Sequence, residues 1–213
     1  MTHSIVEDKL RAEYFDLLAD IRSVTEELET RVRYAVLEFL VNREDFEFIT
    51  VKSRVKECQS AIDSVRRRQE GNAFDDSLID TYTLTKLKDL AAVRLLVFPT
   101  SKVADIDTVL KQTFCEWESD PVYDDGEPRQ LLAHKYCGYC ESNKRVMGEY
   151  QIVPMLIGLF WDVEHSAIYK PVPRLEGIAR SLPMRQQKEN VYSALIDFAE
   201  EFEKLLSEEE AVE

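Results

Sequence analysis

One short segment constrains the fold most strongly. The run from Leu90 to Phe98 is apolar except for Arg94, and Pro99 ends it. A run this short and this rich in valine and leucine is typical of a strand that is buried on both faces of a sheet. A helical pattern follows Ser101, with apolar residues at Val103, Ile106, Val109, Leu110 and Phe114. A buried strand that leads into a helix predicts a fold in which helices pack on a sheet.

A second segment, from Arg145 to Val153, has a period of two. One face would carry Val146, Gly148, Tyr150 and Ile152, and the other Met147, Glu149 and Gln151. This period predicts a strand that holds Glu149 and Gln151 side by side on one face. Pro154 suits the first turn of a helix, which we expect to end near residues 169–171.

The rest of the chain gives weaker patterns, mostly helical. Residues 4–42 predict a long helix with one break, and the other expected elements are a strand at 46–51, a helix at 53–69, a strand near 115–117, a loop at 121–129 and a helix at about 186–206. We therefore predict an α+β fold with a mixed β-sheet of about five strands flanked by helices. The expected parts are an N-terminal helical segment (1–45), a core (46–171) and a C-terminal helix with an acidic tail (172–213).

Composition limits the class of protein. With 213 residues and 45% hydrophobic content, the chain suits one domain with helical extensions. No apolar run reaches the length of a membrane span, and the first residues lack the order of a signal peptide. We therefore expect a cytoplasmic protein with no membrane partner. The net charge of −14 argues against a broad nucleic-acid surface, although Arg66 to Arg68 could be either a solvated helix face or a contact with phosphate.

The cysteines do not indicate a disulfide framework or a zinc site. Cys137 and Cys140 have the spacing of a redox motif, but they lie in the middle of the chain. A zinc site would need a second such pair of cysteines or a nearby pair of histidines, and the sequence has neither. A redox or metal role for these cysteines is therefore disfavoured.

Two carboxylates lie in or beside the predicted strands. An unpaired buried carboxylate is costly, so Asp89 should have a basic partner such as Arg94, a capping role, or a metal. Glu149 is ordinary if its face meets solvent. If that face lines a cleft, Asp89 and Glu149 could share Mg²⁺, which prefers oxygen ligands.

Basic and aromatic residues accompany these carboxylates. Arg54, Lys56 and Arg66 place positive charge near the start of a predicted helix, which suits a triphosphate. The chain has no Walker-type glycine loop, so a P-loop fold is not expected. Tyr139 follows a glycine and could stack on a base, or could be a core or loop tyrosine.

Five segments together resemble the RelA/SpoT nucleotidyltransferase family, the (p)ppGpp synthetases. They are Ser53 to Lys56 with Ser60, the strand Asp89 to Val97, Lys135 to Tyr139, Glu149 to Ile152, and Trp161 to His165 with Tyr169 and Lys170. Their order and approximate spacing match the family over residues 46–171. The length leaves no room for the hydrolase domain of the long enzymes, so the resemblance is to the small, synthetase-only type.

The resemblance implies a function and a role for each site residue. The family transfers the β,γ-pyrophosphate of ATP to a nucleotide 3′-hydroxyl. Arg54 and Lys56, with Arg66 nearby, would bind the phosphates of ATP, and Asp89 would hold Mg²⁺. Glu149 would complete the metal site or activate the hydroxyl. On the acceptor side, Lys135 would meet phosphates, Tyr139 would stack on the base, and Gln151 would lie in the pocket.

The acceptor side departs from the family pattern. Cys137 replaces an asparagine, Cys140 a basic residue and Asn143 a histidine, and Val153 stands where the family has an arginine. Three functions follow as alternatives: synthesis of (p)ppGpp from GDP or GTP in the stringent response, pyrophosphorylation of the tRNA 3′ end by a toxin with an antitoxin partner, or nucleotide binding without catalysis. The resemblance also suggests a homo-oligomer.

Overall fold

The computed structural model describes residues 4–124, 129–165 and 173–210. The helices in these ranges are α1 (Ile5–Ala35), α2 (Leu37–Val41), α3 (Cys58–Arg66), α4 (Lys102–Thr113), α5 (Met155–Glu164), α6 (Glu176–Ala179) and α7 (Leu182–Glu210). The strands are β1 (Phe48–Val55), β2 (Ala91–Phe98), β3 (Glu118–Ser119), β4 (Val122–Tyr123), β5 (Leu131–Tyr139) and β6 (Met147–Pro154). Short 3₁₀ turns at 70–72 and 76–81 lie between α3 and β2.

The strands form one six-stranded sheet in the order β1-β2-β6-β5-β3, with β4 also paired to β5. The pair β2–β6 is parallel and the other pairs are antiparallel. The predicted α+β fold with a mixed sheet is therefore confirmed. Strand β2 lies between two neighbours and is buried on both faces, as its apolar run predicts.

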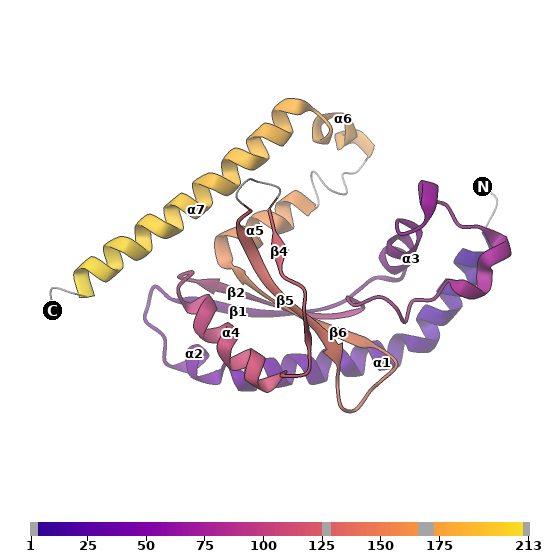
Figure 1. Ribbon diagram of the computed structural model, residues 1–213, viewed down its shortest axis with the longest axis horizontal. Coiled ribbons are helices and arrows are strands. Elements are labelled where there is room, and N and C mark those ends of the chain that lie inside the picture. The colour runs from indigo at the N-terminus through magenta and orange to yellow at the C-terminus, as the bar shows by residue number, and fades with distance from the viewer. Residues whose placement is uncertain (1–3, 125–128, 166–172, 211–213) are drawn as a thin grey trace.

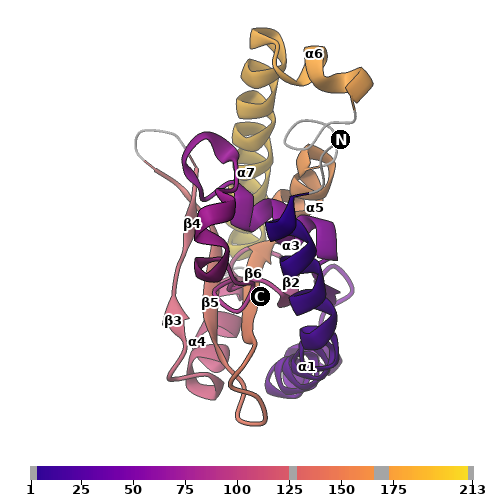
Figure 2. The same ribbon diagram turned by 90° about the vertical axis from the view of Figure 1, so that its right-hand side faces the viewer.

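Helices cover the two faces of the sheet unequally (Figure 1). Helices α1 and α4 pack on one face, where α1 contributes a buried stripe that includes Leu10, Leu17, Ile21, Val24 and Leu28. Helix α5 packs on the other face, where Leu96, Val153 and Ile157 form a smaller core with residues of α7. This smaller core lies near the C-terminal ends of β2 and β6, so the rest of that face is left for polar side chains. Figure 2 shows β3 and β4 at the edge of the sheet far from α1.

Several predicted boundaries change. The first helix breaks at Val36, between α1 and α2, as expected. Strand β1 continues to Val55 and α3 begins at Cys58, so the predicted strand end at residue 51 and helix start at 53 were wrong. The first residues of the predicted helix, 53–55, belong instead to an edge strand that pairs with β2 as far as Val55.

Strand β5 was not predicted, and it lies between β6 and β3 in the sheet. Its residues alternate between the two faces of the sheet, but His134 and Lys135 interrupt the apolar pattern. The strand expected near residues 115–117 is β3, slightly later in the chain, and the expected loop at 121–129 contains β4. The expected end of the helix after Pro154 and the boundary at 171/172 lie outside the described residues.

The length and the apolar content of the helices can be compared with what a membrane span requires. Over the described ranges, no helix is both long enough and apolar enough to cross a lipid bilayer. The longest C-terminal helix, α7, carries acidic residues along its last turns.

Two facing glycines make room for Trp117. Gly138 and Gly148 are partners across β5 and β6. A Cβ atom on Gly138 would lie 2.5 Å from the indole ring, and one on Gly148 would lie 3.0 Å from it. The indole in turn packs on Tyr150, with 5.6 Å between ring centroids. The absence of side chains at these two positions therefore lets Trp117 lie flat against the sheet.

We expect Gly138→Ala to destabilise the protein by about 1–3 kcal/mol, because the new methyl group would overpack against the indole ring and force it to shift from its contact with Tyr150. Urea denaturation measures this change. Gly177→Ala is the control, because nothing lies within 4 Å of the position that its Cβ would take. Equal stability of the two variants would contradict the packing described for Trp117.

Candidate active site

Two rows of side chains cross the face of the sheet that α5 leaves open. The first row takes residues from five strands, and the second takes residues from four strands and ends in Asp120, just after β3. The first row is Arg54, Ala92, Glu149, Cys137 and Glu118. The second row is Lys52, Arg94, Gln151, Lys135 and Asp120. Because side chains alternate along a strand, both rows point to the same face.

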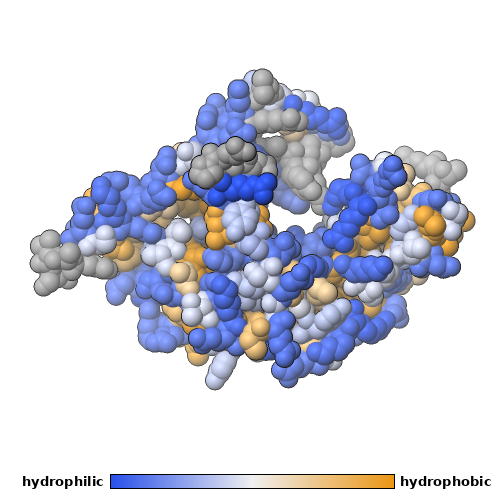
Figure 3. Space-filling view, viewed as in Figure 1, coloured by the Kyte–Doolittle hydropathy of each residue, from blue (hydrophilic) through white to orange (hydrophobic). Residues whose placement is uncertain are grey.

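A cavity of about 710 Å³ lies over these rows. The sheet, Asp89 and the end of α5 line it, and α5 contributes Trp161, Asp162, Glu164 and His165. A second cavity of about 410 Å³ adjoins it and shares Arg54, Asp89 and His165 with it. Residues Lys56, Ser60, Ser64 and Arg67 line the second cavity from the α3 side. Figure 3 shows the surface hollowed between α3 and the end of α5.

Asp89 has basic partners. It accepts a short hydrogen bond from the Lys56 ammonium group and lies 3.7 Å from the Arg54 guanidinium. Lys56 is only 8% exposed, so this carboxylate neutralises a buried positive charge. The expected pair with Arg94 is not formed, because Arg94 bonds to Asp162 and Gln151 instead.

Glu149 is a buried carboxylate, 6% exposed. Its Oε1 accepts a hydrogen bond of 2.7 Å from Gln151 Nε2, and its Oε2 lies 3.8 Å from Cys137 Sγ. Burial raises the pKa of Glu149, and the negative charge of Asp89 raises it further. A carboxylate with a raised pKa that lines a cavity is suited to accept a proton from a bound hydroxyl group.

Arg94 connects the sheet to α5. Its guanidinium donates to Gln151 Oε1 at 3.0 Å and to Asp162 at 3.0 Å, and it lies 5.7 Å from the centroid of the Trp161 ring. Asp162 also lies 3.6 Å from the Lys52 ammonium group. A chain of contacts thus runs from Glu149 through Gln151 to α5 and holds the wall of the cavity in place.

The structure brings most of the predicted site residues together. Asp89, Glu149, Arg54, Lys135 and Gln151 line the larger cavity, and Lys56 lines the adjoining one. Lys135 lies 2.8 Å from Asp120. Tyr139 lines neither of these cavities: it lies at the end of β5, 41% exposed.

Arg66 is not brought to the site. It is the last residue of α3 and bonds to Glu7 at 2.5 Å and to Asp63 at 2.8 Å. On this helix, Ser60, Ser64 and Arg67 follow the i, i+4, i+7 spacing of one face, and that face lines the second cavity. Arg66 therefore lines neither cavity, whereas Arg67 lines the second one.

Sequence reasoning missed several residues that line the larger cavity: Lys52, Arg94, Trp161, Asp162 and His165. Two of them could have been found from the period of two. Lys52 alternates with Arg54 on β1, and Arg94 alternates with Ala92 on β2. The residues at the end of α5 have no period of two, and the sequence indicated them only through the family-like segment from Trp161 to His165.

The carboxylates suit one kind of metal site. Among the described residues, no group of three or more His, Cys, Asp or Glu side chains is placed to hold an ion. Mg²⁺ commonly needs only one or two carboxylates, because water and substrate phosphates complete its coordination. Asp89 and Glu149 fit that pattern, since both line the same cavity.

The cysteines are free thiols, and the structure gives no sign of a redox pair. Burial raises the pKa of Cys137 to about 12 and that of Cys140 to about 11. Thiols with such pKa values are protonated at neutral pH and are poor nucleophiles.

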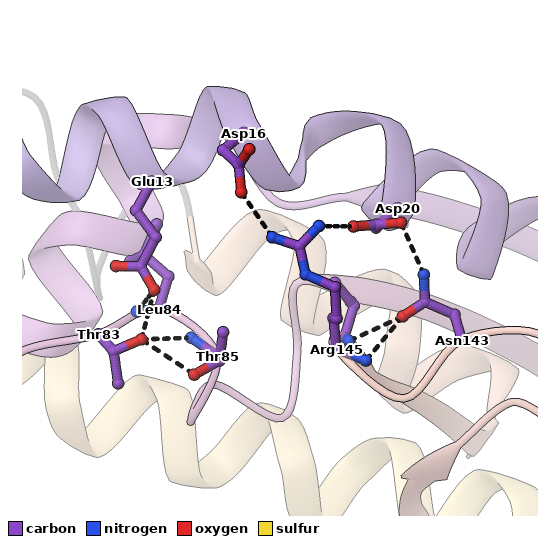
Figure 4. A network of polar contacts seen from close by, with 9 residues as sticks. Glu13, Asp16, Asp20, Thr83, Leu84, Thr85, Asn143 and Arg145 are labelled. Carbon is purple, nitrogen blue, oxygen red and sulfur yellow. Dashed lines mark hydrogen bonds and ion pairs between the residues drawn. The ribbon is translucent and has the colours of Figure 1, made fainter.

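Helix α1 holds the two segments that lead into the site (Figure 4). Beyond β5, Asn143 donates to Asp20 at 2.8 Å, and Arg145 donates to Asp16 and Asp20 at 2.5 and 2.7 Å. Before β2, Glu13 accepts hydrogen bonds from the Thr83 hydroxyl and the backbone N–H of Leu84. The ends of β5 and β2 near the cavity are therefore fixed to the same helix.

Comparison of the sequence with models of protein families and with curated proteins finds no match. Solved structures do match the fold, among them the following three. Small alarmone synthetase 1 from Bacillus subtilis bound to AMPCPP is 18% identical, with a TM-score of 0.61 over 93% of this chain and 98% of that chain. The same enzyme bound to its product pppGpp is 18% identical, with a TM-score of 0.62 over 92% and 98%. A GTP pyrophosphokinase family protein from Streptococcus pneumoniae is 17% identical, with a TM-score of 0.61 over 92% and 94%.

These matches span nearly the full length of both chains, so they cover the sheet, the helices on its two faces and the elements that form the cavities. The chain has the fold of the small alarmone synthetases.

Proposed function

We propose that this protein transfers the β,γ-pyrophosphate of ATP to the 3′-hydroxyl of GDP or GTP and so makes (p)ppGpp, as a cytoplasmic enzyme of the stringent response. The observation that carries the proposal is one cavity in which Asp89 and Glu149 lie beside Lys52, Arg54 and Arg94. The fold supports it, because a synthetase of the same fold has been solved with AMPCPP, an ATP analogue, and with pppGpp.

The cations at the β1 side of the cleft suit the donor. Lys52 and Arg54 are about half exposed, and their ion pairs are long, at 3.6 and 3.7 Å. A triphosphate can therefore replace these contacts at small cost. Lys56 and Arg67 extend the positive charge into the adjoining cavity, where the hydroxyl group of Ser60 adds a hydrogen-bond donor.

Asp89 and Glu149 would hold Mg²⁺, which spreads the negative charge that develops at the attacked phosphorus. Glu149 would accept the proton of the acceptor 3′-hydroxyl. The 3′-oxygen then forms a bond to the β-phosphorus, the bond between that phosphorus and the α,β-bridging oxygen breaks, and AMP leaves. Gln151 orients Glu149 through the 2.7 Å hydrogen bond to Oε1.

The tRNA 3′ end, with an antitoxin as partner, is the alternative acceptor, and the altered residues Cys137 and Asn143 are the argument for it. The surface charge opposes it. Arg66 is bonded to Glu7 and Asp63, and Arg145 is bonded to Asp16 and Asp20. Two cations that a tRNA-binding patch would use are thus neutralised within the chain, which favours a small nucleotide.

The acceptor can be identified directly. The protein is incubated with Mg²⁺ and ATP labelled at the γ-phosphate, and GDP, GTP, ATP or deacylated tRNA is offered in turn. We expect the label on GDP and GTP. Label on tRNA alone would identify the toxin activity instead. ATP binding without transfer to any acceptor would contradict an enzymatic function and leave a nucleotide-binding module.

A further inference from the structure

The two rows of side chains carry opposite charge at their two ends. At the β1 end, Lys52 and Arg54 provide exposed positive charge. At the β3 end, each row finishes in a carboxylate, Glu118 in the first row and Asp120 in the second. The donor cations lie at the first end, so the carboxylates face the side that is left for the acceptor.

Each of these carboxylates neutralises a lysine on the acceptor side. Asp120 lies 2.8 Å from Lys135, and Glu118 lies 2.9 Å from Lys88. Lys88 belongs to the segment before β2, and strands β6 and β5 lie between β2 and β3 in the sheet. The pair of Glu118 with Lys88 therefore reaches across two strands. The two pairs belong to adjacent rows, because Glu118 is the register partner of Cys137 and Asp120 is bonded to Lys135, two residues earlier on β5.

Backbone pairing holds the carboxylates in these positions. Glu118 is the register partner of Cys137, and the backbone N–H of Asp120 donates to the carbonyl of Lys135 at 2.8 Å. The ion pairs affect both partners: Lys135 lowers the pKa of Asp120, and Glu118 raises the pKa of Lys88. The N–O distances also differ between the two sides: they are 2.8–2.9 Å in the acceptor-side ion pairs and 3.6–3.7 Å in the donor-side ion pairs.

We infer that Glu118 and Asp120 are specificity-determining residues that discriminate against 5′-phosphates on the acceptor nucleotide. The inference rests on the proposed function. An acceptor phosphate that approaches Lys88 or Lys135 must displace a carboxylate or bear repulsion from it, and the cost increases with each added phosphate. The site therefore favours guanine nucleotides with few phosphates, in the order GMP, GDP, GTP.

The test compares the wild type with Glu118→Gln, Asp120→Asn and the double variant. Each keeps the shape of the side chain and removes its charge, and both side chains are exposed enough for the fold to tolerate the change. The measurement is kcat/KM for GMP, GDP and GTP at saturating ATP and Mg²⁺. We expect each single variant to shift the GTP/GMP ratio towards GTP by about five- to tenfold.

Glu116→Gln is the matched control, because it removes an exposed carboxylate from the turn before β3. A ratio that stays within about twofold of the wild type in both single variants would overturn the inference, as would an equal shift in the control. Calorimetric titration with GMP and GTP in the presence of a non-hydrolysable ATP analogue separates the two proposals. A shift in the binding ratio without any transfer would support this inference and contradict the proposed reaction. Transfer with unchanged ratios would contradict only this inference.

Discussion

Asp89→Asn is expected to reduce pyrophosphate transfer by at least about 10³-fold and to leave the fold intact. Asp89 lies where the two cavities meet, and it is one of two carboxylates placed to hold Mg²⁺. Asparagine is a weaker ligand because it carries no charge, so the metal would bind more weakly and stabilise the transition state less. The measurement is kcat for transfer to GDP at increasing Mg²⁺.

The fold should survive because asparagine keeps an oxygen that can accept the hydrogen bond from Lys56. Asp89→Ala removes that oxygen and leaves a buried ammonium group without its partner, which we expect to cost a further 1–3 kcal/mol, roughly the penalty for an unsatisfied buried donor. Asp105→Asn, on the exposed side of α4, is the control for loss of one carboxylate. If Asp89→Asn retains more than about a tenth of wild-type activity, the assignment of the metal site is wrong.

The sequence predicted the elements whose pattern is set by burial alone. Strand β2 is apolar on both faces because it lies between β1 and β6 with helices on each side. Strand β6 alternates because one face packs under α1 and α4 while the other carries Glu149 and Gln151 into the cleft. Both patterns are local, so they can be read from the residues in order.

The segments that the sequence did not predict as strand, the end of β1 and the whole of β5, share a physical cause. Each places polar side chains on the cleft face, which weakens the apolar period that marks a strand. In β1 these are Lys52 and Arg54, and in β5 Lys135. The feature that conceals these strands from sequence reasoning is thus the polar cleft itself. The error at Arg66 follows from it, because the misplaced helix start left the face of α3 undetermined.

The sequence also did not predict which side chains form ion pairs with one another across the site. Asp89 could be expected to need a basic partner, but the sequence offered Arg94 five residues away. The structure pairs it with Lys56 and Arg54, because antiparallel pairing of β1 with β2 brings those residues to the start of β2. Such partners depend on register, which residue patterns do not determine at an edge strand.

Glu149→Gln is expected to reduce transfer by about 10²–10⁴-fold, the range for removal of a positioned proton acceptor. Glutamine cannot take the proton of the 3′-hydroxyl, although it fills the same space and can still hydrogen-bond to Gln151. Binding of ATP should change far less than kcat, because Lys52, Arg54 and Lys56 remain. Single-turnover measurements at saturating ATP separate the two effects.

The same variant should be more stable than the wild type at neutral pH, which a purely structural role for Glu149 would not produce. Burial raises the pKa of Glu149 in the folded state above its value in the unfolded chain. The folded state therefore binds the proton of Glu149 more tightly than the unfolded chain does. The stability that this gives is fully present below the pKa that Glu149 has in the unfolded chain, and it is lost as the pH rises through the pKa that Glu149 has in the folded state. At neutral pH the buried charge costs stability, and glutamine removes that cost.

We accordingly expect Glu149→Gln to raise Tm by a few degrees at pH 7 without Mg²⁺. For a chain of this size, such a rise corresponds to a change of the order of 1 kcal/mol in the free energy of unfolding. The difference from the wild type should shrink as the pH falls and vanish below about pH 4, where the carboxyl group is protonated in both states. Thermal unfolding from pH 4 to pH 8 measures it, with Glu116→Gln as an exposed control that should show no such trend. A difference that is constant with pH, or a loss of stability at pH 7, would show that Glu149 is not held as a buried charge. In that case the raised pKa could not be part of the mechanism, and the proton of the 3′-hydroxyl would need another acceptor.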